Sequence, residues 1–269
     1  MKKYNNIMLS IFKILSLIIC AVLILSSCEK NEPSNDTLDT EVSKISADAE
    51  LEATEDMGER YIDGIIFIGE STTYHIKSRG VLRDGKDTKQ VWSTSAGTMT
   101  LDTNIAAARI VYPETLEEIT LYEAASKAKP QIFVLTFGLN GAVSKVQRGE
   151  EYYKSCYMAL IDELRRGSPN SDIIIQACPP VAENMDTSAY KVDVKTLNSY
   201  IDTLNGWAKR MCAEQGIYYL ASNSALKDSK GYLEASYQVG DGYHLTASAY
   251  EKMLGYIRTH GIVKENVGK

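Results

Sequence analysis

Three side chains that can act together in hydrolysis come from two distant parts of the sequence: Ser71 from the first, and Asp241 and His244 from the second. A serine hydroxyl is a weak nucleophile unless a base accepts its proton, and the imidazole of His244 can serve as that base. A carboxylate three residues earlier on the same loop can hold the other ring nitrogen in the required tautomer, and Asp241 has this position. These residue types predict nucleophilic attack by serine, if the fold brings the two regions together.

Such a serine also needs hydrogen-bond donors where negative charge develops on the substrate oxygen. The candidates are the backbone N–H of Ser71 at a helix start, the backbone N–H of Gly97 and the side-chain amide of Asn140. Loss of one donor of this kind typically raises the barrier by about 3–4 kcal/mol. Taken singly, Ser71 fits a helix N-cap and Asn140 fits a turn. The joint occurrence of all these residues favours the chemical interpretation.

The elements that must position these residues follow from the apolar pattern. Continuous apolar runs bounded by glycine and proline are typical of strands buried on both faces. Five such runs predict strands at Ile65–Ile68, Gln90–Trp92, Gln131–Phe137, Asp172–Ala177 and Ile217–Leu220.

Amphipathic stretches between these runs predict helices. They lie after a capping-box spacing at Thr115–Glu118, over Tyr153–Leu164 and Val194–Met211, and from Thr246 onward. Alternation of strand and helix predicts a parallel sheet with helices on both faces. In such a sheet, binding and catalysis occur at the carboxyl ends of the strands.

Four polar turns would meet at that edge. They are Gly69–Thr72, Ser95–Gly97, Gly138–Gly141 and Asp241–Thr246. Their glycine, serine, asparagine and Asp-x-x-His residues resemble the four blocks of the SGNH/GDSL hydrolase family, in that family's order. The resemblance covers about residues 62–260.

The family resemblance implies an α/β fold, namely a flavodoxin-like three-layer α/β/α sandwich with a five-stranded parallel sheet. It implies a metal-independent esterase or acylhydrolase without a cofactor. It makes Ser71 the nucleophile, His244 the base and Asp241 its orienting acid, with Ser71, Gly97 and Asn140 as oxyanion donors. This chain departs from the family pattern at Glu70, where the family usually has Asp. The departure concerns how the turn that carries Ser71 is held in place.

The first residues read as a targeting segment. Lys2 and Lys3 precede an apolar run from Ile14 to Leu25, and Leu25-Ser26-Ser27-Cys28 resembles a bacterial lipobox. We therefore expect a lipoprotein signal peptide over residues 1–27 and a lipid on Cys28, which anchors the protein to the cell membrane at the cell surface. An uncleaved N-terminal anchor that starts near Ile7 is the alternative.

Residues 28–60 are expected to be an acidic tether. Residues 29–60 hold eleven Asp or Glu against three basic residues, and few of them are large and apolar. Such a composition buries too little surface to fold alone. The hydrolase domain is accordingly expected to span residues 61–269.

The amino-acid composition limits which kinds of ligand and partner the protein is expected to bind. The formal charge of -6 over 269 residues argues against nucleic-acid binding, which needs clustered Lys and Arg. With three His and no CxxC pair, no metal site is expected. Outside the N-terminal segment the chain has Cys156, Cys178 and Cys212, which are expected to be buried thiols, with one disulfide as an open alternative. The oligomeric state is left open.

The expected substrate is an acylated small molecule or polysaccharide. Tyr74, Trp92, Pro180 and Tyr243 are candidates for lining the site, and the polar loop Val181–Tyr190 for a lid. The expected function is a cell-surface serine esterase that removes a short acyl group, with acetyl preferred, from a carbohydrate or cell-envelope polymer. The alternatives are an extracytoplasmic O-acyltransferase with the same triad and a catalytically inactive binding lipoprotein.

Overall fold

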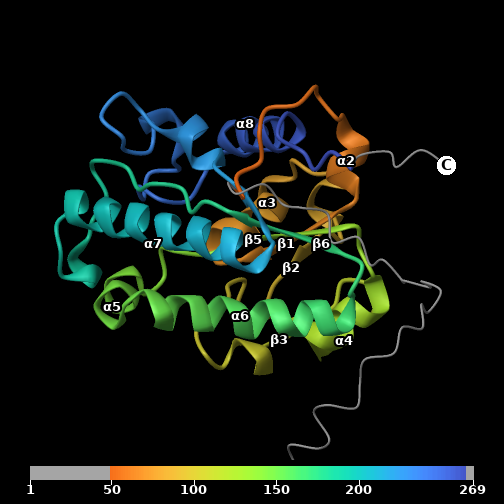
Figure 1. Cartoon of the computed structure of the whole chain (residues 1–269). Coiled ribbons are helices and arrows are strands. Elements are labelled where there is room, and N and C mark those ends of the chain that lie inside the picture. The colour runs from red at the N-terminus through yellow and green to blue at the C-terminus, as the bar shows by residue number, and fades with distance from the viewer. Residues whose placement is uncertain (1–48, 265–269) are drawn as a thin grey trace, which may run out of the picture. The chain divides into compact units, whose positions relative to one another are not determined.

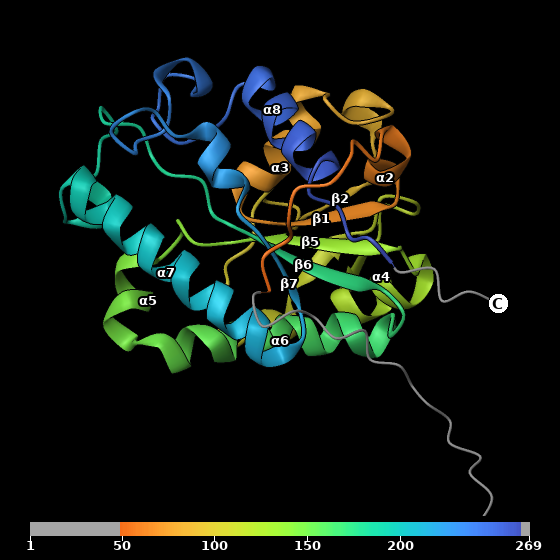
Figure 2. The same ribbon diagram turned by 45° about the horizontal axis from the view of Figure 1, so that its top comes forward.

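The computed structural model describes residues 49–264, which contain a five-stranded sheet between helices (Figure 1). The strand order is β2-β1-β5-β6-β7, and every neighbouring pair is parallel (Figure 2). The strands are β1 (Ile65–Gly69), β2 (Val91–Trp92), β5 (Ile132–Thr136), β6 (Asp172–Gln176) and β7 (Tyr218–Leu220). All five strands expected from the apolar runs are present, and the doubly wound parallel fold is confirmed.

Helices cover both faces of this sheet, which makes three layers (Figure 2). One face packs against α2 (Glu59–Asp63), α3 (Ser71–Arg79) and α8 (Ala247–Arg258). The other packs against α4 (Leu121–Ala128), α6 (Glu150–Gly167) and α7 (Val194–Gln215). The short α5 (Ala142–Arg148) follows β5. Alternate residues of one strand face opposite layers, because Phe133 and Leu135 join one core and Ile132 and Val134 the other.

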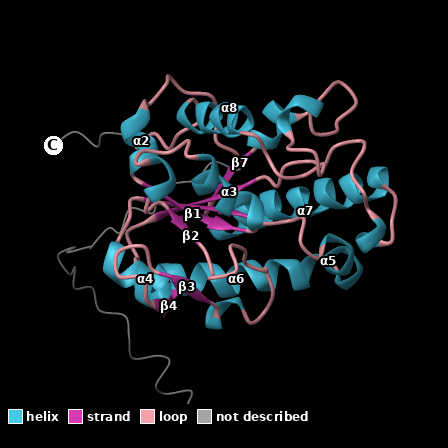
Figure 3. Ribbon diagram, turned by 180° about the vertical axis from the view of Figure 1, so that it is seen from behind, coloured by secondary structure: helices cyan, strands magenta, loops and turns pink. Residues whose placement is uncertain are grey.

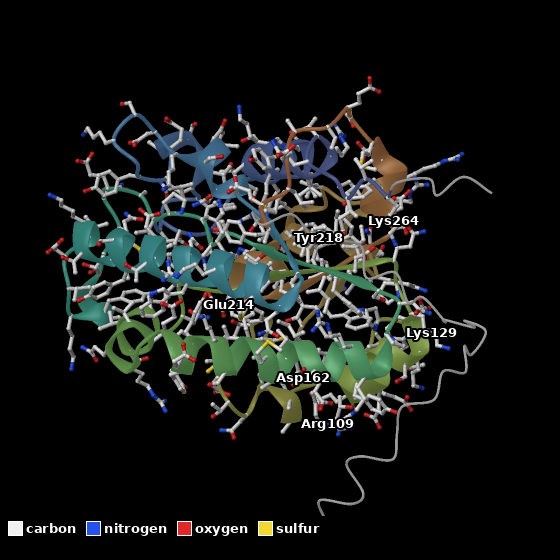
Figure 4. The ribbon with its side chains drawn as sticks, viewed as in Figure 1. Arg109, Lys129, Asp162, Glu214, Tyr218 and Lys264 are labelled. Atoms are coloured by element: carbon white, nitrogen blue, oxygen red, sulfur yellow. The ribbon has the colours of Figure 1, made fainter. Side chains whose placement is uncertain are left out.

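The long helices begin and end where capping chemistry directs. Asp193 caps α7 by accepting the backbone N–H of Thr196, and Gly216 ends it in the left-handed conformation. Thr246 caps α8 through the N–H of Ala249, as the sequence predicts. Figure 4 labels Glu214 near the end of α7, where its carboxylate accepts from Lys154 of α6 at 2.8 Å.

One helix starts later than the capping-box spacing at Thr115–Glu118 predicts. Residues Arg109–Val111 (β3) and Glu118–Thr120 (β4) instead pair as a small antiparallel hairpin (Figure 3). The working capping box is Thr120 with Glu123, and α4 begins at Leu121. Thr115 and Glu117 lie in the hairpin turn, where their side chains bond each other at 3.1 Å.

The folded region begins earlier than residue 61. Ala49 and Leu51 are buried, and backbone hydrogen bonds of 2.8 Å join both to Tyr219 of β7. Thr54 and Met57 donate backbone N–H groups to the end of α8. Because most residues from 29 to 60 are acidic or polar, their composition does not indicate that these two apolar side chains are packed. The expectation of a tether as far as residue 60 is wrong for residues 49–60. The rest of the expected tether, the signal peptide and Cys28 lie outside the described residues.

Cys156, Cys178 and Cys212 are buried free thiols. Cys178 lies under the turn after β5, and the other two belong to α6 and α7. No helix between residues 49 and 264 combines the length and the apolar character that crossing a membrane requires.

The packing of the early segment gives a stability prediction. Leu51→Ala should lower the free energy of unfolding by about 2–3 kcal/mol, because it removes a buried side chain at the sheet edge. The exposed neighbour Glu52 provides a control, and Glu52→Ala should change the free energy of unfolding by less than about 0.5 kcal/mol. Urea denaturation measures both. Equal midpoints for the two variants would show that this segment adds nothing to the fold.

Candidate active site

The structure brings Ser71, His244 and Asp241 into one hydrogen-bonded chain. Ser71 Oγ lies 2.9 Å from Nε2 of His244, and Nδ1 of His244 lies 2.7 Å from Oδ2 of Asp241. Ser71 is the first residue of α3, whereas the other two lie in the loop before α8. An imidazole with a carboxylate on one nitrogen and a hydroxyl on the other is arranged to accept the hydroxyl proton.

The parallel register places Ser71 beside the turn that carries Asn140. Gly69 and Thr136, the last residues of β1 and β5, are paired, so both chains leave the sheet at the same level. Gly69 has no room for a side chain, since a Cβ there would lie 2.2 Å from Thr73 Oγ1 and 2.4 Å from the Thr136 carbonyl oxygen. This close approach allows α3 to begin directly after the strand.

The loop that carries the acid and the base is held by its own polar groups. Oδ1 of Asp241 accepts the backbone N–H groups of Tyr243 and His244 at 3.1 and 3.0 Å. Oε1 of Gln238 accepts the N–H of Gly242 at 3.0 Å and that of Gly240. Burial raises the pKa of Asp241, but the N–H groups and the imidazole outweigh it and hold the pKa below its usual value. Asp241 is therefore a carboxylate at neutral pH.

Two of the three expected oxyanion donors are available. The N–H of Ser71 stands at the start of α3 and makes no backbone hydrogen bond within residues 49–264. The side-chain amide of Asn140 has one long hydrogen bond, 3.4 Å to Thr98 Oγ1.

The expectation that the Gly97 N–H is an oxyanion donor does not fit the structure. That N–H donates to the Thr94 carbonyl at 2.9 Å and closes a turn in which Gly97 has a φ of 71°. Because this N–H is already bonded within the Thr94–Gly97 turn, the donors that remain for the oxyanion are the Ser71 N–H and the Asn140 amide.

Glu70 has a contact that the sequence does not reveal. Its buried carboxylate accepts three successive backbone N–H groups, from Gly138, Leu139 and Asn140, at 3.0–3.2 Å. Acceptance of three N–H groups favours the ionised form of this side chain. Burial raises the pKa of Glu70, and the three N–H groups and the nearby Lys145 oppose that rise. The residue that replaces the family's usual Asp thus ties the nucleophile turn to the Asn140 turn.

Two further side chains near the site, Lys145 and His75, could not be recognised as such from the sequence. Lys145 on α5 is 3% exposed and donates its ammonium to the Asn140 carbonyl. The His75 ring lies 4.2 Å from the ring of His244, one helical turn after Ser71. A lysine on a short polar helix and a histidine four residues from a serine are ordinary patterns, so only the fold shows what these side chains contact.

The four candidates for lining the site divide into two pairs. Tyr74 is 37% exposed with its ring over Gly97, and Tyr243 lies 4.1 Å from His244, ring centre to ring centre. Trp92 is 1% exposed and packs against Tyr112 and Phe133, so it is a core residue and not a rim residue. Pro180 is also buried and lines no open rim.

The polar loop Val181–Tyr190 packs beside the catalytic loop. Ala182 donates its N–H to the Gly242 carbonyl at 2.7 Å, and Met185 fills the space where a Gly242 side chain would lie. Two asparagines of α7 hold the start of this loop and the chain just before it: Asn198 bonds both backbone groups of Val181, and Asn205 those of Cys178. A role for this loop as a lid stays a prediction. Within residues 49–264, no cluster of His, Cys, Asp and Glu is arranged to hold a metal ion.

Several solved structures are similar to this chain. A Streptococcus pneumonia protein assigned provisionally as a platelet activating factor is 17% identical, with a TM-score of 0.51, over 72% of this chain and 82% of that one. A GDSL-like lipase from Bacteroides thetaiotaomicron is 17% identical, with a TM-score of 0.48, over 72% and 85%. A carbohydrate acetylesterase from Sinorhizobium meliloti is 14% identical, with a TM-score of 0.47, over 72% and 95%. A search of curated proteins finds no match.

The family assignment comes from a sequence model. Residues 67–252, which run from β1 into α8, match the model of the GDSL-like lipase/acylhydrolase family. This range contains Ser71, the Asn140 turn and the Asp241–His244 loop. The chain belongs to the GDSL-like lipase/acylhydrolase family and is a serine ester hydrolase.

Proposed function

We propose that the enzyme removes short acyl groups, acetyl foremost, from a carbohydrate or cell-envelope polymer at the bacterial cell surface, with Ser71, His244 and Asp241 as its catalytic residues. The observation that carries the catalytic part is the continuous hydrogen-bonded chain from Asp241 through His244 to Ser71. The lipobox-like sequence before Cys28 supports the location.

The openness of the site supports a short acyl group on a large substrate. The Asp241 side chain is 38% exposed and Tyr74 is 37% exposed, so the catalytic loop and its neighbouring ring both reach solvent. Each buried methylene of an acyl chain gains about 0.8 kcal/mol, which an open polar edge cannot provide. The exposed Tyr74 and the partly exposed Tyr243 offer flat apolar faces of the kind that a sugar ring can contact.

In the proposed reaction, Nε2 of His244 takes the Ser71 proton as Oγ attacks the acyl carbon. The resulting oxyanion accepts the Ser71 N–H and the Asn140 amide. His244 then returns the proton to the leaving hydroxyl of the substrate, which departs and leaves an acyl-serine. Water attacks this ester, with His244 again as base, and releases the carboxylic acid and free Ser71.

The roles of the triad are tested on 4-nitrophenyl acetate. Ser71→Ala should lower kcat by about four to six orders of magnitude, because the nucleophile is lost. Asp241→Asn should lower it by about 10⁴-fold or less, because the amide no longer selects the tautomer of His244. Ser78→Ala on the same helix is the matched control and should leave kcat unchanged. Turnover by folded Ser71→Ala at the wild-type rate would remove Ser71 from its proposed role.

The Asn140 amide has its own kinetic signature. Asn140→Ala should lower kcat by about 10²–10³-fold with little change in KM, because the amide acts on charge that exists only in the transition state. Steady-state kinetics on the same ester measures this, with the exposed Asn104→Ala as control. A change confined to KM would assign Asn140 to substrate binding.

The substrate class is tested by acetate release from O-acetylated polysaccharides and peptidoglycan. The protein should release acetate from at least one polymer, and it should hydrolyse the acetyl nitrophenyl ester faster than the butyryl or octanoyl nitrophenyl esters at matched concentration. Ser71→Ala should release none. A preference for octanoyl esters with no polymer cleaved would contradict the proposed substrate. Transfer of acetyl to an added sugar, without acetate release, would assign the same residues to an acyltransferase.

A further inference from the structure

Two buried side chains of opposite charge hold the backbone of Asn140 from its two ends. The Glu70 carboxylate accepts the Asn140 N–H at 3.0 and 3.1 Å, while the Lys145 ammonium donates to the Asn140 carbonyl oxygen. Glu70 is 2% exposed and Lys145 is 3% exposed. We propose that Lys145 is a positioning residue of the reaction, which together with Glu70 fixes the Asn140 amide where the oxyanion forms. This proposal rests on the proposed function of Asn140.

The environment argues that Lys145 is not simply a packed side chain. Removing an ammonium group from water costs several kcal/mol unless strong hydrogen bonds and an opposite charge replace the water. Lys145 donates a hydrogen bond to the Asn140 carbonyl, and although burial lowers the pKa of Lys145, the nearby Glu70 is the main group that opposes this decrease. A core position that needed only volume would be better served by an apolar residue, because replacing buried charges with such residues is often neutral or stabilising.

The effect of this arrangement falls on the side chain of Asn140. Within residues 49–264 its amide has only the 3.4 Å bond to Thr98, so little holds the amide directly. The backbone to which it is attached must therefore set its position. Because the Gly97 N–H is used by Thr94, the Asn140 amide is one of two remaining oxyanion donors, and an error in its position affects the barrier strongly.

The two charges also depend on each other. Burial raises the pKa of Glu70, and Lys145 is one of the groups that oppose this rise. Without the ammonium the pKa of Glu70 rises further, so the carboxylate takes a proton at a higher pH and loses its acceptor role toward the turn. Asp102 also faces Lys145. The other groups that face Glu70 have pKa values raised by burial and stay neutral: Tyr153, Tyr157, Cys178 and Tyr190.

The test is a double-mutant cycle with kcat on 4-nitrophenyl acetate. In the wild-type background, Lys145→Met should lower kcat by about 10²-fold with KM nearly unchanged. In the Asn140→Ala background the same substitution should lower kcat by less than about twofold, because the amide on which it acts is gone. Lys145→Arg keeps the charge in a displaced position and should lose less activity than Lys145→Met, again only when Asn140 is present.

A pH profile separates positioning from a general structural role. The acid limb of kcat for Lys145→Met should move to higher pH, whereas Lys145→Arg should keep the wild-type limb. Lys154→Met is the matched control, since Lys154 on α6 bonds Glu214 and Glu150 away from the site and should change neither kcat nor its pH profile.

Several outcomes would overturn the proposal without touching the proposed function. One is an equal loss of kcat from Lys145→Met with and without Asn140; another is wild-type kcat in folded Lys145→Met. If Lys145→Met does not fold, the Lys145→Arg cycle decides, and equal losses in both backgrounds overturn the proposal. By contrast, a wild-type protein that cleaves no ester, or a fully active Ser71→Ala, would refute the proposed function itself.

Discussion

The side-by-side ending of β1 and β5 is the constraint on which the site depends. Their five-residue parallel register brings Gly69 level with Thr136, so the next residues of both chains leave the sheet at one edge. Glu70 then reaches across and accepts three N–H groups of the neighbouring turn. The catalytic serine and the oxyanion amide are thus set by one strand pairing and one carboxylate, and the His244 loop is added from the far end of the chain.

Much of this fold follows from pattern alone. Runs such as Ile65–Ile68 and Gln131–Phe137 can bury both faces only in the middle of a sheet, and Gly216 ends α7 because glycine adopts the left-handed conformation without strain. Thr115–Glu118 misled because a capping-box spacing also fits a turn between two short strands, and the true box at Thr120 lies five residues later. Local spacing does not distinguish the two, since the turn is determined by the pairing of β3 with β4 on either side of it.

The site was predictable to the extent that its chemistry depends on residue type. Ser71, His244, Asp241 and Asn140 could be singled out because few other side chains offer a nucleophile, a base or an amide at the right turns. The hydrogen bond from the Gly97 N–H to the Thr94 carbonyl could not be predicted, because the sequence does not show which acceptor a backbone N–H bonds. Lys145 was missed for a different reason: its burial results from the packing of the short α5 against α6 and α7.

The pairing of Ala49 and Leu51 with β7 has a consequence for neighbouring molecules. β7 is the last strand of the sheet, and strands with unpaired backbone groups are templates on which another polypeptide can add. The early residues occupy those groups at Tyr219 through bonds in both directions. At the opposite edge of the sheet, the strand β2 is only two residues long, which leaves little backbone for another strand to pair with. Crowded copies of this enzyme would therefore find little backbone on which to nucleate aggregation.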